Sequence, residues 1–305
     1  SPKEKWTQLQ ALDIRNGKVA WTSQCGVNMG MSTLPQKRKD GRMVAIVGRG
    51  GGHGPPERPF GISMVDLKDG KTLWRHAVKT RWGDFMSGVG PRSTPTLHAG
   101  KLYALFTDGS LVCLQADSGK PLWKAKVVND EPEFPEWGLS CSPLVWNDLV
   151  IVTPGGENGA TRAYQTDSGK LAWSSDLHGE GVYMSPCILN LLGKEHLITA
   201  VSGKIAFLDP RSGKTSWAGS WKIFLNNAQI AQPLALPKDS FLLSAGYGKG
   251  SERWTVKPGE GEFFVIDAAW KSKNLKSKFS NPVLKDGFIY GFNENSFTCL
   301  NASDG

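Results

Sequence analysis

The heptapeptide DSGKPLW, residues 117–123, decides the fold, because variants of it recur along the chain. They read RNGKVAW at 15–21, KDGKTLW at 68–74, DSGKLAW at 167–173 and RSGKTSW at 211–217. The last three residues, SDG at 303–305, match the first half of a further copy. A turn glycine followed at a fixed spacing by a tryptophan therefore marks an internal repeat.

The turn glycines of these copies set the period of the repeat. They are Gly17, Gly70, Gly119, Gly169, Gly213 and Gly305. Neighbouring glycines are about 50 residues apart, except that the last interval is nearly twice as long. We therefore expect a degenerate copy at about residue 271. There, GEFFVIDAAWKSKNLKSKF (261–279) keeps the strand FFVIDA and lacks both the turn glycine and a tryptophan at the expected spacing.

Each copy reads as four short strands. Residues 92–128 supply RSTPTLHAG, KLYALFTDG, SLVCLQADSG and KPLWKAKVV, four runs rich in β-branched and aromatic residues that glycine-containing turns separate. This pattern predicts a four-stranded antiparallel meander, and a single such sheet has too small a core to be stable alone. The sequence therefore predicts an all-β fold, a β-propeller whose four-stranded blades bury their faces against one another.

The two ends of the chain bear on the number of blades. Residues 1–24 supply the last two strands of one blade, and residues 279–305 supply the first three strands of another. Because these pieces share one strand type, they cannot together form a single blade without duplication. We expect one propeller domain over residues 1–305, either a trimmed eight-bladed ring or an irregular seven-bladed one.

A tryptophan follows the turn glycine by four residues in five copies. These residues, called the docking tryptophans below, are Trp21, Trp74, Trp123, Trp173 and Trp217. On the outermost strand of a blade, an indole is well placed to bury a large area against the next blade. We expect the docking tryptophans to be structural, and the alternative is that they stack on a carbohydrate or a cofactor.

The repeat resembles that of a known family. The pattern LD…SGK..W, with blades that open on Ser-Pro pairs such as Ser142-Pro143 and Ser185-Pro186, is similar to the tryptophan-docking repeat of the PQQ-like (pyrroloquinoline quinone) β-propellers. Residues 90–123, 136–156 and 231–250 resemble the BamB-like, non-enzymatic branch of that family. The resemblance implies a bacterial, periplasmic or otherwise exported scaffold with a protein or an envelope polymer as partner. It says little about activity, because one scaffold carries many functions.

The enzymes of the same family supply an alternative function. Quinoprotein dehydrogenases hold PQQ against a disulfide between adjacent cysteines and bind calcium through a Glu, Asn and Asp set. None of the five cysteines here is adjacent to another, and the five histidines follow no metal-ligand spacing. We therefore expect no PQQ, no calcium, no other metal and no catalytic residue, and we keep a quinoprotein-like enzyme as the alternative. The disulfide state of the cysteines stays open.

The chain carries a basic excess, with 36 Lys and Arg against 28 Asp and Glu and a net charge of +8. Such a surface attracts anions, so a propeller that binds acidic glycans is a further alternative. Apart from KTRW, PQKRKDGR and KSKNLKSK, the basic residues are scattered, and we interpret these runs as solvated loop charges. Nucleic acid is therefore not an expected partner. No apolar run is long enough for a transmembrane helix.

Three loops depart most from the bare repeat and are the candidate binding sites, since function often lies on loops that a rigid scaffold holds. They are residues 48–61, 127–138 and 246–261. Their candidate binding residues are Arg49, His53, Glu57, Arg58, Phe134, Trp137, Tyr247, Arg253 and Trp254. This mixture of aromatic and charged side chains suits an interface with a protein. The alternative is that Trp137 and Trp254 simply cover the edges of blades.

Overall fold

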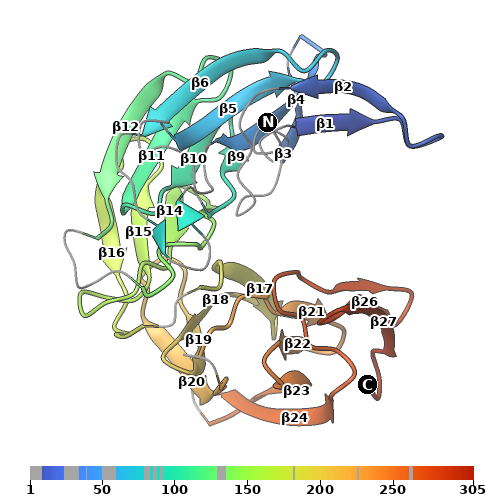
Figure 1. The fold of residues 1–305 in the computed structure, drawn as a ribbon. Coiled ribbons are helices and arrows are strands. Elements are labelled where there is room, and N and C mark those ends of the chain that lie inside the picture. Colours follow the sequence, from blue (N-terminus) through green and yellow to red (C-terminus); the bar gives the residue numbers. More distant parts are fainter. Residues whose placement is uncertain are drawn as a thin grey trace. The chain divides into compact units, whose positions relative to one another are not determined.

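The computed structural model describes residues 9–23, 34–38, 40–49, 60–78, 83–84, 88–89, 92–128, 135–180, 183–224, 227–260 and 264–305. These residues form strands, turns and loops, and they contain no helix (Figure 1). In this part of the chain there is accordingly no helix that is long and apolar enough to cross a membrane.

The strands are short and follow one another closely. In chain order they are β1 (Leu9–Leu12), β2 (Val19–Ser23), β3 (Leu34–Lys37), β4 (Met43–Arg49), β5 (Phe60–Asp66), β6 (Thr72–Val78), β7 (Gly83–Asp84), β8 (Gly88–Val89), β9 (Thr96–His98), β10 (Lys101–Leu105), β11 (Ser110–Gln115), β12 (Pro121–Lys126), β13 (Leu144–Trp146), β14 (Leu149–Val152), β15 (Arg162–Gln165), β16 (Leu171–Ser174), β17 (Cys187–Leu191), β18 (Lys194–Val201), β19 (Lys204–Leu208), β20 (Thr215–Ser220), β21 (Leu234–Leu236), β22 (Ser240–Ala245), β23 (Gly250–Pro258), β24 (Phe264–Ser272), β25 (Val283–Lys285), β26 (Phe288–Asn293) and β27 (Ser296–Asn301).

Strands that are consecutive in the chain pair with each other. The sheets β3–β6, β9–β12, β13–β16, β17–β20 and β21–β24 have four strands each, β25–β27 has three, and β1–β2 and β7–β8 have two. The predicted all-β fold of four-stranded antiparallel blades is therefore confirmed. So are the two strands expected at the beginning of the chain and the three expected at its end.

The chain forms two compact units. The first comprises Ser1–Val150 with Gln165–Lys170, and the second comprises Ile151–Tyr164 with Leu171–Gly305. The single domain over residues 1–305 stays a prediction.

In the first unit, the facing sides of β3–β6 and β9–β12 bury one apolar cluster. Ile46 and Ile62 on one sheet and Leu102 and Phe106 on the other are fully buried there. Alternate residues of each strand supply this cluster, as expected for sheets stacked face to face.

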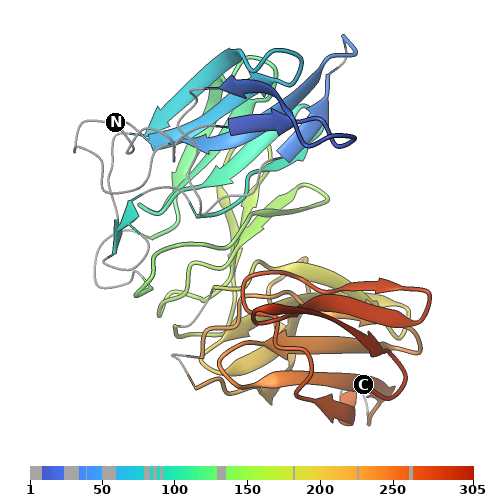
Figure 2. The same ribbon diagram turned by 45° about the vertical axis from the view of Figure 1, so that its right-hand side comes forward.

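In the second unit, Figure 2 shows β25–β27 lying over β21–β24, and an apolar cluster joins the two sheets. Its buried members are Leu236, Leu242, Leu275, Ile289, Leu300 and Ala302. A larger cluster between β17–β20 and β21–β24 includes Phe207, Trp221, Phe241 and Trp254. The blades thus depend on their neighbours for a core, which is the expected behaviour of stacked repeats.

Indoles and turn glycines meet at the joins between neighbouring sheets. The Nε1 atoms of Trp21, Trp74 and Trp123 donate to the carbonyls of Leu67, Ala116 and Thr166 at 2.8, 2.9 and 3.0 Å. The same indoles lie against Gly70, Gly119 and Gly169, and Trp173 lies against Gly213. These glycines have φ between +69 and +74°, so each position requires both a left-handed backbone and the absence of a Cβ.

The degenerate copy exists as the sheet β21–β24, but its turn and its tryptophan were misplaced in the prediction. The turn was expected at about residue 271, after FFVIDA and without a correctly spaced tryptophan, whereas residues 264–272 form β24, the fourth strand of the sheet. Trp270 on β24 donates from Nε1 to the carbonyl of Ala302 at 3.2 Å and lies against Gly305. The turn was misplaced because the repeat was read from its glycine, and Ile266 stands four residues before Trp270, where the other copies have that glycine.

A long hairpin explains the missing glycine. In other blades the pairing of the third and fourth strands ends just beyond the bulge that precedes the tryptophan, whereas the pairing of β23 with β24 continues to Pro258 and Phe264. Trp217 therefore meets no turn glycine there. Its indole instead packs edge-on against Trp254, with ring centroids 5.9 Å apart.

Hydrogen bonds between residues that precede prolines connect the beginnings of the first strands of neighbouring sheets. Ser142 Oγ accepts a hydrogen bond from Thr94 N at 3.0 Å. Asn281 Oδ1 accepts one from Gln232 N at 2.9 Å, and Asn281 Nδ2 donates to Gln232 Oε1 at 3.0 Å. Proline keeps the residue before it extended, which leaves these side chains free to reach the adjacent backbone.

Candidate functional site

Five of the nine predicted binding residues have side chains that the structure does not place. Arg49 ends β4, but its side chain lies outside the described part of the chain. His53, Glu57, Arg58 and Phe134 lie wholly outside the described residues. Their role in binding stays a prediction.

Trp137, Arg253 and Trp254 make contacts within the fold. The carbonyl of the half-buried Trp137 accepts a hydrogen bond from Arg92. The guanidinium of Arg253 donates to Ser240 Oγ at 3.0 and 3.1 Å, to the Pro237 carbonyl at 3.1 Å and to the Ala302 carbonyl at 3.0 Å. These bonds hold Arg253 against the end of β27.

Trp254 lies in the core rather than on a rim. It is 8% exposed, and its ring packs against Trp217, Trp221 and Phe241 at centroid distances of 5.8 to 5.9 Å. Its Nε1 donates to Glu252 Oε2 at 3.0 Å. These contacts agree with the alternative in which this tryptophan serves blade packing.

Tyr247 differs from these residues, because it lies at the turn between β22 and β23 and is only half-buried. Its φ is +56°, and Gly248 follows at +73°, the backbone of a two-residue hairpin turn. The ammonium of Lys278 lies 4.5 Å from the centroid of its ring. Burial raises the pKa of the Tyr247 hydroxyl, so the side chain is neutral and presents an aromatic face at neutral pH.

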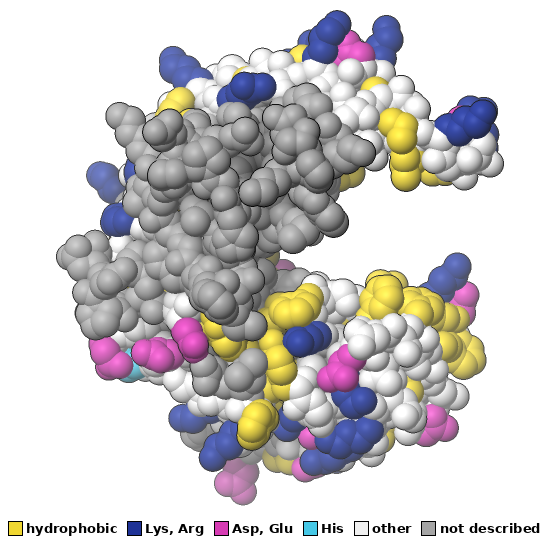
Figure 3. All heavy atoms as spheres, in the orientation of Figure 1, with side chains coloured by type: hydrophobic (Ala, Val, Ile, Leu, Met, Phe, Trp, Pro, Cys, Tyr) yellow, Lys and Arg dark blue, Asp and Glu magenta, His cyan; other side chains and the backbone are white. Residues whose placement is uncertain are grey.

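Lysines and aromatic side chains gather around Tyr247. We call this set the rim cluster; Tyr247, Lys249, Lys273, Lys278 and Phe279 are connected by contacts, and Phe224 is included because it follows by three residues the Trp221 that Lys249 contacts. Phe224 is 95% exposed and Phe279 is 72% exposed, while the ammonium of Lys278 lies 5.2 Å from the ring of Phe279. On the face shown in Figure 3, hydrophobic and basic side chains lie side by side over this part of the chain.

Lys249 occupies the most enclosed position of the rim cluster. Its Nζ lies 4.0 Å from the ring centroid of the buried Trp221 and 3.8 Å from Glu252 Oε1. Burial lowers its pKa, the carboxylate of Glu252 opposes this, and the nearby Lys271 and Lys273 lower it further. The lysines of this rim therefore repel one another.

The sequence reading missed most of the rim cluster. Lys273 and Lys278 belong to the run KSKNLKSK, which was interpreted as solvated loop charge, and Phe279 directly follows that run. Phe224 and Lys249 come from two other segments. The signal in the sequence that could have indicated this cluster was a basic run that ends on an aromatic residue. The meeting of three separate loops could not be predicted from the sequence.

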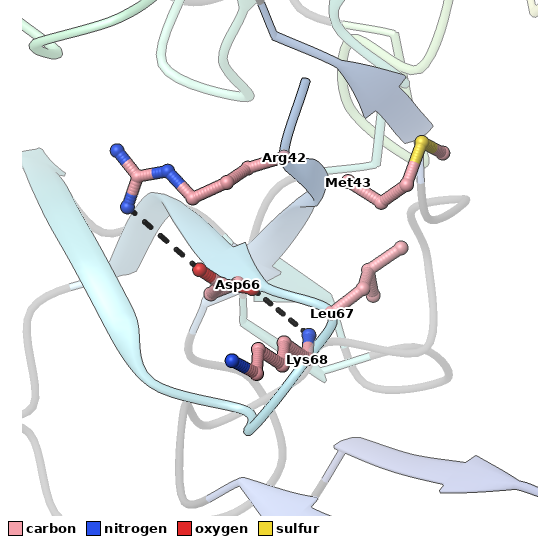
Figure 4. Close-up of a pocket in the computed structure, with 5 residues that line it drawn as sticks. All are labelled: Arg42, Met43, Asp66, Leu67 and Lys68. Carbon is pink, nitrogen blue, oxygen red and sulfur yellow. Dashed lines mark hydrogen bonds and ion pairs between the residues drawn. The ribbon is translucent and has the colours of Figure 1, made fainter. Parts of the chain in front are cut away.

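A small open pocket lies in the first unit, between the β3–β4 and β5–β6 turns (Figure 4). Its volume is about 330 Å³, and Arg42, Met43, Asp66, Leu67 and Lys68 line it. Asp66 Oδ2 lies 3.8 Å from Arg42 Nη1, and Oδ1 accepts a hydrogen bond from Lys68 N at 2.8 Å. The one carboxylate of this pocket is thus engaged by its neighbours, and the other ionisable lining residues are the basic Arg42 and Lys68.

The side chains of the described residues can be compared with those that hold PQQ and calcium in the quinoprotein enzymes. Among the described residues, no three His, Cys, Asp or Glu side chains come together as a metal-binding group. Burial raises the thiol pKa of Cys113 to about 11 and that of Cys187 to about 12, and both remain as thiols. The described residues therefore do not fit the calcium and disulfide arrangement of the quinoprotein enzymes. The absence of a cofactor stays a prediction.

Comparison with known proteins identifies the family. The family model described as "Outer membrane protein assembly factor BamB" matches residues 60–305. The chain belongs to this family. The resemblance to BamB-like members of the PQQ-like β-propellers is thereby confirmed.

Individual relatives of the BamB family are distant. BamB of Bordetella pertussis is 21% identical over 204 residues, which are 67% of this chain and 45% of that protein. Quinohemoprotein alcohol dehydrogenase ADH IIB of Pseudomonas putida is 32% identical over 119 residues, which are 37% of this chain and 17% of that enzyme. The matches thus span less than half the length of both relatives.

A solved BamB structure supports the fold. BamB from Moraxella catarrhalis is similar with a TM-score of 0.65 and 16% identity, over 94% of this chain and 78% of that one. At this identity the likeness shows a β-propeller fold and leaves the function open.

Proposed function

We propose that this protein is an extracytoplasmic β-propeller scaffold that presents its inter-blade loops to a protein partner and takes part in the assembly of outer membrane proteins. The observation that carries the proposal is the family match over residues 60–305. The exported location and the partner class follow from the name and the expected setting of that family, and they are proposals for this chain.

The surface chemistry of the second unit supports a binding role. Phe279 exposes 72% of its area beside Lys278, and Phe224, on the β20–β21 connection, exposes 95%. Exposed apolar side chains that lie next to charged ones are typical of surfaces that bind a partner. The blades carry the connecting loops on stacked, buried apolar clusters, which fix where these loops leave the sheets.

A second candidate is a quinoprotein-like redox enzyme, which the match to alcohol dehydrogenase ADH IIB favours. That match covers 17% of the enzyme. In the pocket at Arg42 and Asp66, the carboxylate is already engaged by an ion pair and a backbone hydrogen bond. The scaffold is therefore the better-supported function.

Purification from native cells after chemical cross-linking tests the scaffold. We expect the full-length protein to retain outer membrane proteins or their assembly factors in amounts comparable with its own. A protein that crosslinks to no envelope protein, and that oxidises an alcohol when PQQ and calcium are supplied, would reverse the order of the two candidates.

A further inference from the structure

We propose that the rim cluster is a docking site for an acidic, extended polypeptide segment that carries aromatic or aliphatic side chains. Lys273 and Lys278 bind its carboxylates, and Phe224 and Phe279 cover its apolar side chains. This inference rests on the proposed scaffold function and names the chemistry of the partner.

Three chain segments bring the rim cluster together at one end of the blades. They are the β20–β21 connection, the β22–β23 turn and the β24–β25 connection. In an antiparallel meander, the turn after the second strand and the connection after the fourth lie at the same end of the sheet. The contacts agree: Lys273 Nζ donates to the carbonyls of Gly248 and Lys249 at 2.8 and 2.9 Å.

The ammonium groups of the rim exceed the carboxylates that face them. Within the described residues, Glu252 is the carboxylate in contact with them, 3.8 Å from Lys249 and 3.4 Å from Lys271. Its side chain is 14% exposed, so it cannot turn outward to serve the outer lysines. An incoming carboxylate would relieve the repulsion that remains among Lys249, Lys271 and Lys273.

The aromatic groups give the site its apolar part. Lys278 lies between the rings of Tyr247 and Phe279, at 4.5 and 5.2 Å, which holds its ammonium in place by cation–π attraction. Phe224 and Phe279 keep 95% and 72% of their area in water. Burying such side chains is favourable, and aromatic residues are enriched at the centres of protein interfaces.

The neighbouring loops favour a short acidic segment over a long polyanion or an anionic membrane. Glu157 and Glu180 are exposed on the β14–β15 and β16–β17 connections of the same unit, which lie at the same end of their blades. Figure 3 shows acidic side chains gathered on the part of this face near β16. A polyanion that extended beyond the rim cluster would meet these carboxylates, whereas a peptide segment is confined to the three loops.

The test is fluorescence anisotropy with the full chain and a short labelled peptide that alternates glutamate and phenylalanine. We expect the peptide to bind, with an affinity that falls as salt rises. The double variant Lys273→Gln/Lys278→Gln should raise Kd about tenfold or more, and Phe279→Ser should raise it by a similar factor. Lys214→Gln, on an exposed turn at the other end of a blade, is the matched control and should leave Kd unchanged.

Three outcomes would overturn the inference. The double variant could bind the peptide as well as the native chain does. A peptide that alternates lysine and phenylalanine could bind equally well. A sulfated oligosaccharide or phosphatidylglycerol vesicles could bind through these lysines where the acidic peptide does not. If the double variant still retained its native partners after cross-linking, those partners would bind outside the rim cluster. The inference would then be wrong, and the proposed scaffold function would still stand.

Discussion

Gly119 and Trp74 show how a pair of residues joins two blades. The indole donates to the carbonyl of Ala116, three residues before the glycine, and its ring rests where the glycine has no Cβ. The glycine also has a φ of +69°, which disfavours any other residue. Two independent requirements therefore apply to the same position, which explains why the motif can be recognised in the sequence.

Replacement of this glycine should separate the two requirements. In Gly119→Ala, a new Cβ would lie 2.6 Å from Cε3 of Trp74, whereas in Gly100→Ala, at a φ of +75°, it would meet nothing within 4 Å. We expect a loss of about 1–2 kcal/mol from the backbone at Gly100 and roughly 1–3 kcal/mol more at Gly119 from the overlap. Urea unfolding measures both, and equal losses would argue against a role for the indole contact.

His196 predicts a dependence of stability on pH. It is 6% exposed, and its ring lies 5.6 Å from Phe207 and 5.1 Å from Phe264. Burial lowers its pKa, a backbone hydrogen bond at Leu191 opposes the shift, and the charges of Lys194 and Asp209 have smaller, opposite effects.

Because the pKa of His196 is lower in the folded state, the unfolded chain takes up the proton first. Its contribution to stability is complete above a pH of about 6.5 and is lost as the pH falls below that value. The unfolding free energy should therefore decrease between pH 7 and pH 5, and it should decrease less in His196→Phe. Parallel pH profiles for the two proteins would contradict this assignment.

The β23–β24 hairpin shows how one element can hide a repeat. Its strands pair well past the position where the other blades turn, so the glycine is lost while the fourth strand and its tryptophan are kept. Trp217 then packs on Trp254 of this hairpin, and Phe264 reaches His196 of the preceding sheet. One lengthened hairpin therefore replaces a turn glycine by an aromatic contact.

The role of Trp270 tests this view of the hairpin. Trp270→Ala should cost roughly 3–5 kcal/mol, as expected for truncation of a large packed aromatic side chain. Trp123→Ala, which removes the same contacts in the first unit, is the matched comparison and should cost a similar amount. A loss below about 1 kcal/mol for Trp270 alone, again from urea unfolding, would show that its contact with Gly305 contributes little.

At the scale of the whole molecule, the absence of a bound cofactor is a prediction that a melting curve can check. Because the described residues gather neither a metal-ligand group nor adjacent cysteines, PQQ with calcium should leave the melting temperature of the full chain unchanged. A ligand that binds only the folded state raises that temperature. Stabilisation by several degrees would therefore revive the enzyme as the leading function.

The repeat and the strand class could be predicted from the sequence, because each depends on local chemistry. The structural role of the docking tryptophans stays a prediction that the substitutions above test. Alternating apolar residues specify a strand, and a left-handed turn specifies a glycine. The fourth strand around Trp270 could not be assigned in this way, since its hairpin has no such glycine. Trp254 was predicted to lie on a rim loop, but it is buried in the core. This burial could not be predicted, because it depends on packing against a sheet that lies far away in the sequence.

The sequence alone determined which segments become blades and, outside the β23–β24 hairpin, where their turns lie, because turns and strand patterns are encoded within about 50 residues. Only the tertiary structure decided that Trp221, Lys249 and Lys278 lie at one end of the blades, because they come from three segments whose meeting depends on the stacking of whole sheets. Local signals fix the repeat, and long-range packing fixes the surface that a partner would meet.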